Sequence, residues 1–587
     1  MGFRRRIVWT RIAIGVVLTI GGSLTANAQG GRGAVAEPYT PAPDAKDLKA
    51  VLFRWMWSTG MLKGHDERDM VASLEYQGKG TIQVDGQPCT LTKYRASTNY
   101  QTFSQRIQYA CTRPNGQTYS NIEVVSGLYA WNEDTPGAQI GTTNGPAKGK
   151  ATPMPAAVEE RLIRFWASPQ GAPKAAMAGT IETFWLGANP GTLFDGGTAK
   201  VGQTSVSWEA GKPVVTFPIP GVPGATATAT LDAKYMTERV VVKQGSRQET
   251  TTTEFAYSDY QDWNNPLNKI EVFYAGKLVE RRNGAVVRDL TTEQTETGNV
   301  YVVAPVPASV QAAIKVTGQL PRGVIAKTEP AIDKSTPTPR LGAHPDLTGN
   351  WTYTDWIGNY MTGGGRRRGP TQKSDVTRQD NQTYDFELYS PSRFGGLGRP
   401  VYKPQHWDKV QQLDMWTNKY DPVMTCQPLG VPREGPPRRI IQTDKDVIFI
   451  YTGGDAGGGY GEYRIIPTDG RKHSKDPNFE FTYLGDTVGR WEGDTLVLDS
   501  VGFTDATWLG RGGFFHSGEM HVVERFTRQG DALLYDVTVE DPEVLVEPWV
   551  LPTRTVTRNP NPDAGLIAER GDCSVPELGN ASSQIRH

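Results

Sequence analysis

Side chains capable of acid–base chemistry concentrate between Gly485 and Arg528, in a stretch that is otherwise rich in strand-forming residues. The candidate proton-transfer groups are Asp499, Asp505, His516 and Glu524. Carboxylates and imidazoles are the groups that most often give and take protons in enzymes, and neither needs a cofactor to do so. The stretch therefore predicts acid–base chemistry by side chains alone.

Alternation of polar and apolar residues predicts that this stretch forms two strands joined by a long loop. In the later strand, Glu524 shares a face with apolar residues, whereas His521 and Arg525 share the opposite face, because successive side chains of a strand alternate. In the earlier strand, Asp499 shares a face with valines. Both acids are predicted to lie inside, where a carboxylate must be paired or protonated and its pKa shifts.

A purely structural role is the alternative for these two acids. Arg464, Arg471 or Arg490 would then pair with them and hold the strands in register.

The loop TDATWLGRGGFFHS is predicted to line one mouth of a β-barrel. It carries Asp505, Trp508, Arg511 and His516, and aromatic walls with a few polar groups are typical of small-molecule pockets. His516 is the preferred proton-transfer residue because an ordinary imidazole titrates near neutral pH, although it could equally anchor the loop by hydrogen bonds.

Two further residues complete the predicted ligand site. Trp491 would add an aromatic wall, and Arg490, like Arg511, would steady negative charge on a bound molecule.

Metal and cofactor sites are not predicted. His516 and His521, with Glu519 and Glu524, are metal-ligating types, but an i, i+5 pair on a strand points to opposite faces and no HExxH helix is present. Ser517 lies beside His516 without a GxSxG elbow. The glycine-rich run 453–462 lacks the Lys-Ser/Thr ending of a phosphate loop.

Length and composition predict a two-domain, strand-rich protein. A chain of 587 residues exceeds the roughly 300 residues at which single cores stop growing. It contains 65 glycines and 41 prolines, which favour turns. Because 62 basic residues balance 63 acidic ones, no field directs the protein to nucleic acid or to an anionic membrane.

The first 28 residues have the features of a signal peptide: a basic start with Arg4, Arg5 and Arg6, a short apolar run and an Ala-Asn-Ala cleavage pattern. An uncleaved anchor is the alternative, but the run is shorter than the roughly 20 residues of a membrane span. Residues 29–45 are predicted to be a flexible leader. The protein is expected to be periplasmic or secreted, with no integral membrane span; its oligomeric state is left open.

Export would place the four cysteines in an oxidising compartment, where disulfides are the default. Cys89 and Cys111 lie on neighbouring predicted strands and are expected to pair. Cys426 and Cys573 would then form the second bridge.

Residues 46–313 are predicted to form the first domain, a succession of β-hairpins with helices near 50–64 and 156–168. The segments LDAKYMTERVVV, FAYSDYQDW and YVVAPVPASV make this part resemble the half-open barrel of LolA-like lipoprotein carriers. The resemblance implies a concave face that shelters an acyl chain or another apolar ligand. A face simply filled with side chains is the alternative.

Residues 314–345 are rich in Pro, Thr and Lys and are predicted to be a linker, followed by a second domain at 346–587. The early Gly349-Asn350-Trp351 resembles the Gly-x-Trp element of lipocalin-like barrels, whose tryptophan packs at the barrel floor.

Four motifs of the second domain resemble a widespread family of uncharacterised exported bacterial proteins, across residues 346–573. These motifs are CQPLGVPR, RIIPTDGR, GRWEGDTL and EDPEVLVEPW. The resemblance implies a shared β-architecture and transfers no activity.

Taken together, the sequence predicts a mainly β protein with two antiparallel β-barrel-like domains that binds a small hydrophobic or aromatic molecule. It would be either a cofactor-independent lyase, isomerase or hydrolase, or a carrier or sensor that leaves its ligand unchanged. A structural protein of the envelope is a third possibility.

Overall fold

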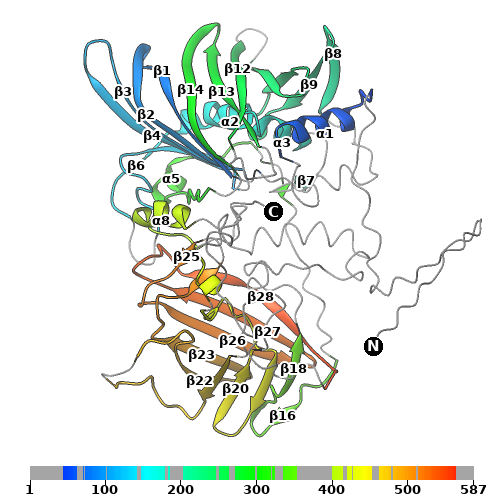
Figure 1. The fold of residues 1–587 in the computed structure, drawn as a ribbon, viewed down its shortest axis with the longest axis vertical. Helices are drawn as coiled ribbons and strands as arrows, with labels where there is room; N and C mark the ends of the chain where they lie inside the picture. Colours follow the sequence, from blue (N-terminus) through cyan, green and yellow to red (C-terminus); the bar gives the residue numbers. More distant parts are fainter. Residues whose placement is uncertain are drawn as a thin grey trace, which may run out of the picture.

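Two antiparallel β-sheets dominate the protein, and helices are few (Figure 1). The computed structural model describes residues 44–562 with gaps, the longest at 62–70, 185–202, 264–271, 324–334, 353–399 and 452–461. One sheet has 13 strands and the other has nine. The predicted fold class is therefore confirmed, while the signal peptide and nearly all of the leader lie outside the described residues.

The first sheet is made of two meanders whose first and last strands, β1 and β14, pair with each other. Its order is β6-β5-β4-β3-β2-β1-β14-β13-β12-β11-β10-β9-β8. The strands of the first meander are β1 (Ser73–Val84), β2 (Gln87–Asn99), β3 (Ser104–Thr112), β4 (Thr118–Ser126), β5 (Tyr129–Glu133) and β6 (Ala151–Pro153). Those of the second are β8 (Ser205–Glu209), β9 (Lys212–Pro218), β10 (Thr226–Leu231), β11 (Thr237–Gly245), β12 (Thr250–Asp262), β13 (Phe273–Arg282) and β14 (Ala285–Thr297).

Three helices pack their apolar residues into one core with this sheet, α1 (Leu48–Ser58), α2 (Val158–Trp166) and α3 (Gly171–Ala178). The first two confirm the predicted helices. Helix α2 forms because its apolar residues fall on one face, with glutamates in its first turn and Arg164 in its last turn, where they complement the helix dipole. In the described part of the chain, no helix has the length and apolar character to cross a membrane.

Short elements complete the chain outside the two main sheets. They are η2 (Pro155–Ala157), β7 (Thr183–Phe184) paired with β15 (Arg322–Gly323), α5 (Ala308–Ala313), β16 (Arg340–Leu341) paired with β17 (His344–Pro345), η4 (Pro404–His406), α8 (Trp407–Gln412), η6 (Pro422–Thr425), and β24 (Trp508–Gly510) paired with β25 (Phe514–Phe515).

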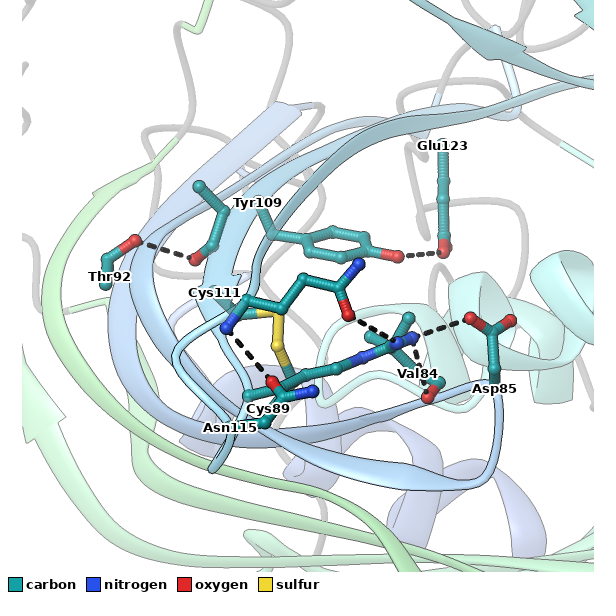
Figure 2. Close-up of a disulfide and its surroundings, with 11 residues drawn as sticks. Val84, Asp85, Cys89, Thr92, Tyr109, Cys111, Asn115 and Glu123 are labelled. Atoms are coloured by element: carbon teal, nitrogen blue, oxygen red, sulfur yellow. Dashed lines mark hydrogen bonds and ion pairs between the residues drawn. A yellow bond between two sulfur atoms is a disulfide. The ribbon is translucent and has the colours of Figure 1, made fainter.

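A disulfide joins Cys89 to Cys111 across β2 and β3, as predicted (Figure 2). Both cysteines are buried in the first core. The nearby β3–β4 turn contains Asn115 and Gly116, and Gly116 adopts a φ of +81°, which is the reason for glycine there. Cys426 and Cys573 lie outside the described residues.

The second sheet follows the chain order and curls so that its first strand pairs with its last. Its strands are β18 (Gly349–Thr352), β19 (Arg439–Gln442), β20 (Asp446–Ile450), β21 (Tyr463–Pro467), β22 (Asp486–Glu492), β23 (Thr495–Val501), β26 (His521–Gln529), β27 (Ala532–Glu540) and β28 (Trp549–Arg558). The remaining edges, β21 and β22, approach closely at Gly489, where a Cβ would lie 3.3 Å from the Cγ2 of Ile466. The sheet is thus a nearly closed barrel.

Trp351 closes one end of this barrel. Its ring is 1% exposed, its Nε1 donates to the Leu347 carbonyl at 3.0 Å, and the guanidinium groups of Arg528 and Arg558 lie 5.4 and 5.6 Å from its ring centre. Glycine suits position 349 because its φ is +145°, which L side chains rarely adopt. The Gly-x-Trp segment therefore packs as a barrel floor.

The first sheet contacts helix α8 through Arg106, and Tyr301, which follows β14, packs in the second core. Arg106 pairs with Glu133, donates to the Val303 carbonyl at 3.1 Å and places its guanidinium 4.5 Å from the Trp407 ring centre. Tyr301 packs in the second core although it precedes the predicted linker. The segment around Tyr301 thereby ties the second barrel to the first sheet.

The Trp351 packing predicts that Trp351→Ala lowers the free energy of unfolding of the second domain by about 3–5 kcal/mol, because a buried ring and its cation partners are lost. Urea titration followed by far-ultraviolet circular dichroism measures this. Val550→Ala, at a side chain that is 66% exposed, is the control and should change little. A loss below about 1 kcal/mol for Trp351→Ala would contradict the floor role.

Candidate functional site

Glu524 lies inside the second barrel, as predicted, and its carboxylate is paired. It is 0% exposed, Arg464 approaches its Oε2 to 2.6 Å through Nη1, and Tyr535 donates to its Oε1 at 2.7 Å. Arg464 also donates from Nε and Nη2 to the Tyr451 hydroxyl at 2.9 and 2.6 Å. This geometry corresponds to the structural alternative, with Arg464 as the partner.

The buried network holds its protons firmly. Burial raises the pKa of Tyr451 and Tyr535 well above the ordinary phenol value. Burial by itself lowers the pKa of Arg464, but the adjacent Glu524 carboxylate more than offsets this and the net pKa is raised. The Arg464–Glu524 pair is thus flanked by the two phenols, and each described member is engaged with another.

Asp499 is not inside the barrel, and the prediction that it shares an interior with Glu524 is wrong. The register between β23 and β26 places Leu498, not Asp499, opposite Glu524. Asp499 therefore faces outward on the same side as His521, whose Nε2 lies 3.0 Å from its Oδ1. The alternation of side chains along each strand was predicted correctly. Alternation within β23 does not show, however, which of its two faces lies on the same side of the sheet as Glu524 of β26.

A chain of alternating carboxylates and imidazoles runs over this outer face. His473 and His521 both place Nε2 3.0 Å from Oδ1 of Asp499. Their Nδ1 atoms lie 3.2 Å from Asp486 and 3.1 Å from Glu540, respectively. His473 comes from the segment that follows β21, so no local spacing could have associated it with Asp499.

His516 is buried and anchors its loop, which is the alternative to proton transfer. It is 3% exposed; its Nδ1 donates to the Ser517 carbonyl at 2.8 Å, so its Nε2 accepts from the Thr507 hydroxyl at 2.7 Å. Burial lowers the pKa of His516, which keeps the imidazole neutral. Ser517 is held in turn by Asp541, at 2.7 Å from its backbone N–H and 2.8 Å from its hydroxyl.

The other residues of the predicted mouth do not form one constellation in the described structure. Trp508 is buried in the second core and Asp505 is exposed, while Arg511 lies outside the described residues. Trp491 lies at the turn end of the β22–β23 hairpin, opposite the end from which the 502–520 loop leaves, and stacks on His344 at 4.5 Å. The expectation that Trp491 shares a pocket with Trp508 is therefore wrong.

Arg490 is an exposed residue of the outer face rather than a pocket wall. It pairs with Glu492 at 2.9 Å and lies 3.7 Å from Asp499. Among the residues that the structure describes, no group of three or more His, Cys, Asp or Glu side chains is arranged to hold a metal ion.

A small cavity lies in the first domain, between the sheet and the C-terminal part of α2, which contributes Arg164 and is followed by Ser168. Its volume is ≈ 10 Å³, which is room for about one water molecule. Its wall combines tyrosines and apolar side chains with a charged end and a few neutral polar groups: Leu74, Tyr76, Thr98, Tyr100, Gln105, Arg164, Ser168, Phe255, Tyr257, Tyr274, Leu278, Glu280 and Arg288. In this conformation the interior is largely filled with side chains, the alternative considered for the LolA-like resemblance.

Arg164 of α2 organises the charged end of the cavity. It contacts Glu123 of β4 at 3.2 Å, Glu160 at 2.9 Å and Glu280 of β13 at 3.4 Å. Burial by itself raises the pKa of Glu160, but the Arg164 charge lowers it to a net value of about 2. Arg164 thus ties the helix to both meanders of the sheet by ion pairs.

A second arginine, Arg288, continues this charged end. It lies 3.5 Å from Glu280 and donates to the Tyr94 hydroxyl at 2.9 Å. Sequence reasoning missed these cavity residues because they come from strands and a helix far apart in the chain, and none belongs to a recognisable motif.

Comparison with known proteins assigns this chain to no family. No protein-family model matches the chain, and no curated protein matches it. Among solved structures, a domain from Vibrio parahaemolyticus assigned to outer membrane lipoprotein sorting is 8% identical, with 42% of this chain and 91% of that chain covered and a TM-score of 0.23. A TM-score this low gives no basis for transferring a fold or an activity, and the family resemblance of residues 346–573 stays a prediction.

The buried pair predicts that Glu524→Gln lowers the free energy of unfolding by about 3–5 kcal/mol, because the Arg464 guanidinium loses its counter-charge inside the barrel. Chemical denaturation measures the loss. The double variant Arg464→Met with Glu524→Leu should regain most of it, since neither charge is then buried alone. If the loss in free energy of unfolding of the double variant equalled the sum of the losses from its two single substitutions, the pairing would be contradicted.

The row of carboxylates and imidazoles on the outer face predicts that Asp499 contributes to the stability of the fold in a pH-dependent way. Burial by itself raises the pKa of Asp499, but hydrogen bonds and charge from His473 and His521 lower it overall. A lowered pKa in the folded state stabilises the fold above the ordinary aspartate range and loses that effect as the pH falls through the folded-state pKa. Asp499→Asn should therefore cost about 1 kcal/mol near pH 6 and less near pH 3.

The control for this experiment is Asp505→Asn, at an exposed carboxylate of the same domain. Unfolding curves at several pH values should show no comparable decrease in the stability cost of Asp505→Asn as the pH falls. A penalty for Asp499→Asn that grows as the pH falls would contradict the assignment.

Proposed function

We propose that the protein is a carrier or sensor that binds a small amphiphile, apolar over most of its length, in the first domain. The supporting observation is the small cavity between the sheet and the C-terminal part of α2. Its tyrosine and leucine walls suit an apolar chain or an aromatic ring, and its charged end, with Arg164, Glu280 and Arg288, suits a polar group.

Ligand entry requires the helices to separate from the sheet, because the cavity is far smaller than a drug-sized ligand site. The contacts that must open are the ion pairs of Arg164 and the hydrogen bond from the Tyr257 hydroxyl to the Ala167 carbonyl, at 2.9 Å. Opening would also expose apolar residues of α2 such as Leu162, Phe165 and Trp166, so a bound amphiphile would have to supply both an equivalent polar group and an apolar chain that covers them. The conformation that the structure shows is then the closed form.

The contacts of the residues first considered for proton transfer favour binding without chemical change over catalysis. His516 uses both ring nitrogens within its own loop, and Glu524 is paired with Arg464 and Tyr535. Neither group points to a position where a substrate could receive its proton. The enzyme hypothesis therefore has no supporting geometry among these residues.

The disulfide supports a place in the cell envelope for this carrier. A bridge such as Cys89–Cys111 persists in oxidising compartments such as the periplasm and the extracellular space. Together with the predicted signal peptide, it supports an exported protein.

The proposal predicts that Leu278→Trp weakens ligand binding at least tenfold, because an indole ring would fill the cavity that Leu278 lines. Fluorescence titration with dansyl-labelled undecanoic acid, a fatty-acid probe whose emission rises in an apolar site, measures the dissociation constant. Val279→Trp is the matched control, since the next residue of β13 points to the opposite face of the sheet.

Equal affinity for the probe in the Leu278→Trp and Val279→Trp variants would sink the proposal, as would failure of the unaltered protein to bind the probe at all. Thermal unfolding of each variant establishes that the comparison is between folded proteins.

A further inference from the structure

The outer face of the second barrel carries an exposed apolar patch on β19, β20 and β21. Tyr463 and Ile465 of β21 are 63% and 59% exposed. Ile465 lies opposite Ile448 of β20, which in turn lies opposite Ile441 of β19. An adjacent residue in each of these strands is buried in the second core, so the four side chains point outward. They are called the Ile465 patch below.

The Ile465 patch differs from the rest of the outer face. On β22, β23 and β26 the outward side chains include Arg490, Asp499 and His521, which are polar. Apolar side chains scattered singly over a surface are ordinary, whereas a group that continues across three paired strands commonly marks a contact surface. The patch therefore calls for a partner.

The described chain ends on the same outer face. The Asn350 side chain of β18 donates to the carbonyls of Asn561 and Pro562 at 3.1 and 3.3 Å. Asn350 points outward, because the residue after it closes the barrel floor. Asn350 lies opposite Arg439 of β19, and the same row of cross-strand partners continues to Tyr463 of β21. This row covers three strand spacings, or roughly 14 Å.

The sequence after Pro562 fits that row in length and in polarity. Asp563 comes first, where it would pass the Arg439 guanidinium, and an apolar run, AGLIA at 564–568, follows. Leu566 and Ile567 stand four and five residues beyond Pro562. An extended chain of this length spans roughly 13–18 Å, which is enough to bring both side chains to the patch.

We propose that residues 563–570 dock across the outer face of the second barrel, with Leu566 and Ile567 on the Ile465 patch. The segment starts on the face that it would cover, so its effective concentration at the patch is high. This tether favours the segment over a second copy of the chain as the occupant. The contact belongs to the second domain and does not depend on the carrier proposal.

Photocrosslinking of the full chain tests this contact. With p-benzoylphenylalanine in place of Ile567, irradiation should join the segment to β20 or β21 of the same molecule, and mass spectrometry of the digested protein identifies the strand. Ile465→Ser should lower the yield of this crosslink at least fivefold, because it removes apolar contact surface. Val550→Ser is the matched control, since Val550 is 66% exposed on β28 and should leave the yield unchanged.

Trypsin supplies a second measurement. A docked segment shields the peptide bond after Arg570, so Ile567→Asp should speed cleavage at that bond at least fivefold. Leu578→Asp places the same charge beyond the docking segment and should leave the cleavage rate unchanged. Thermal unfolding of each variant establishes that folded proteins are compared.

Three outcomes would overturn the inference: no crosslink to β20 or β21, equal yields in Ile465→Ser and Val550→Ser, or an unchanged cleavage rate in Ile567→Asp. Crosslinks between two molecules in place of the internal one would also overturn it, by showing that a second copy covers the patch.

Discussion

Guanidinium groups enclosed by β-sheets must be paired, and both domains of this protein are organised around such pairs. An unpaired buried charge costs several kcal/mol, so each arginine constrains the strands that carry its partners. In the first domain Arg164 connects α2 to glutamates on β4 and β13. In the second, Arg464 of β21 reaches Glu524 of β26 across the barrel interior. Neighbouring strands pair through their backbones, whereas these ion pairs join elements distant in the sheet order.

The same pairing limits what the interiors can do. The two oxygens of the Glu524 carboxylate contact a guanidinium and a phenol, and both ring nitrogens of His516 are hydrogen-bonded within its own loop. The cavity of the first domain differs, because its charged end borders a space that a ligand's polar group could enter if the helices moved. Glu434 differs again, since its Oε2 is buried without a hydrogen-bond partner among the described residues. A functional site is thus best sought where a buried polar group lacks a hydrogen-bond partner.

The contact between the domains follows the same principle. Arg106 is buried against Glu133 and stacks on Trp407, so a charge of the first sheet is shielded by an aromatic ring from the chain that leads into the second. Gly137 lies close by, where a Cβ would come within 2.7 Å of Pro404, and this close approach accounts for glycine at that position. Side chains rather than a continuous sheet therefore hold the two domains together.

The sequence by itself determined what depends on neighbours along the chain. Hairpins, the helices α1 and α2, the Asn115-Gly116 turn and the pairing of Cys89 with Cys111 follow from alternation, helical periodicity and turn chemistry, which are local. Helix α3 was missed because its run of small residues has no distinct apolar face. Strand parity placed Glu524 inside correctly.

Only the tertiary structure decided which strand faces meet and which distant residues become neighbours. Asp499 was assigned to the interior, yet register with β26 turns it outward to His473 and His521, because parity along one strand does not determine the face that its partner presents. The cavity charges and the orphaned oxygen of Glu434 are likewise set by packing between segments far apart in the chain. Pairing and burial are properties of the assembled core, and no local pattern encodes them.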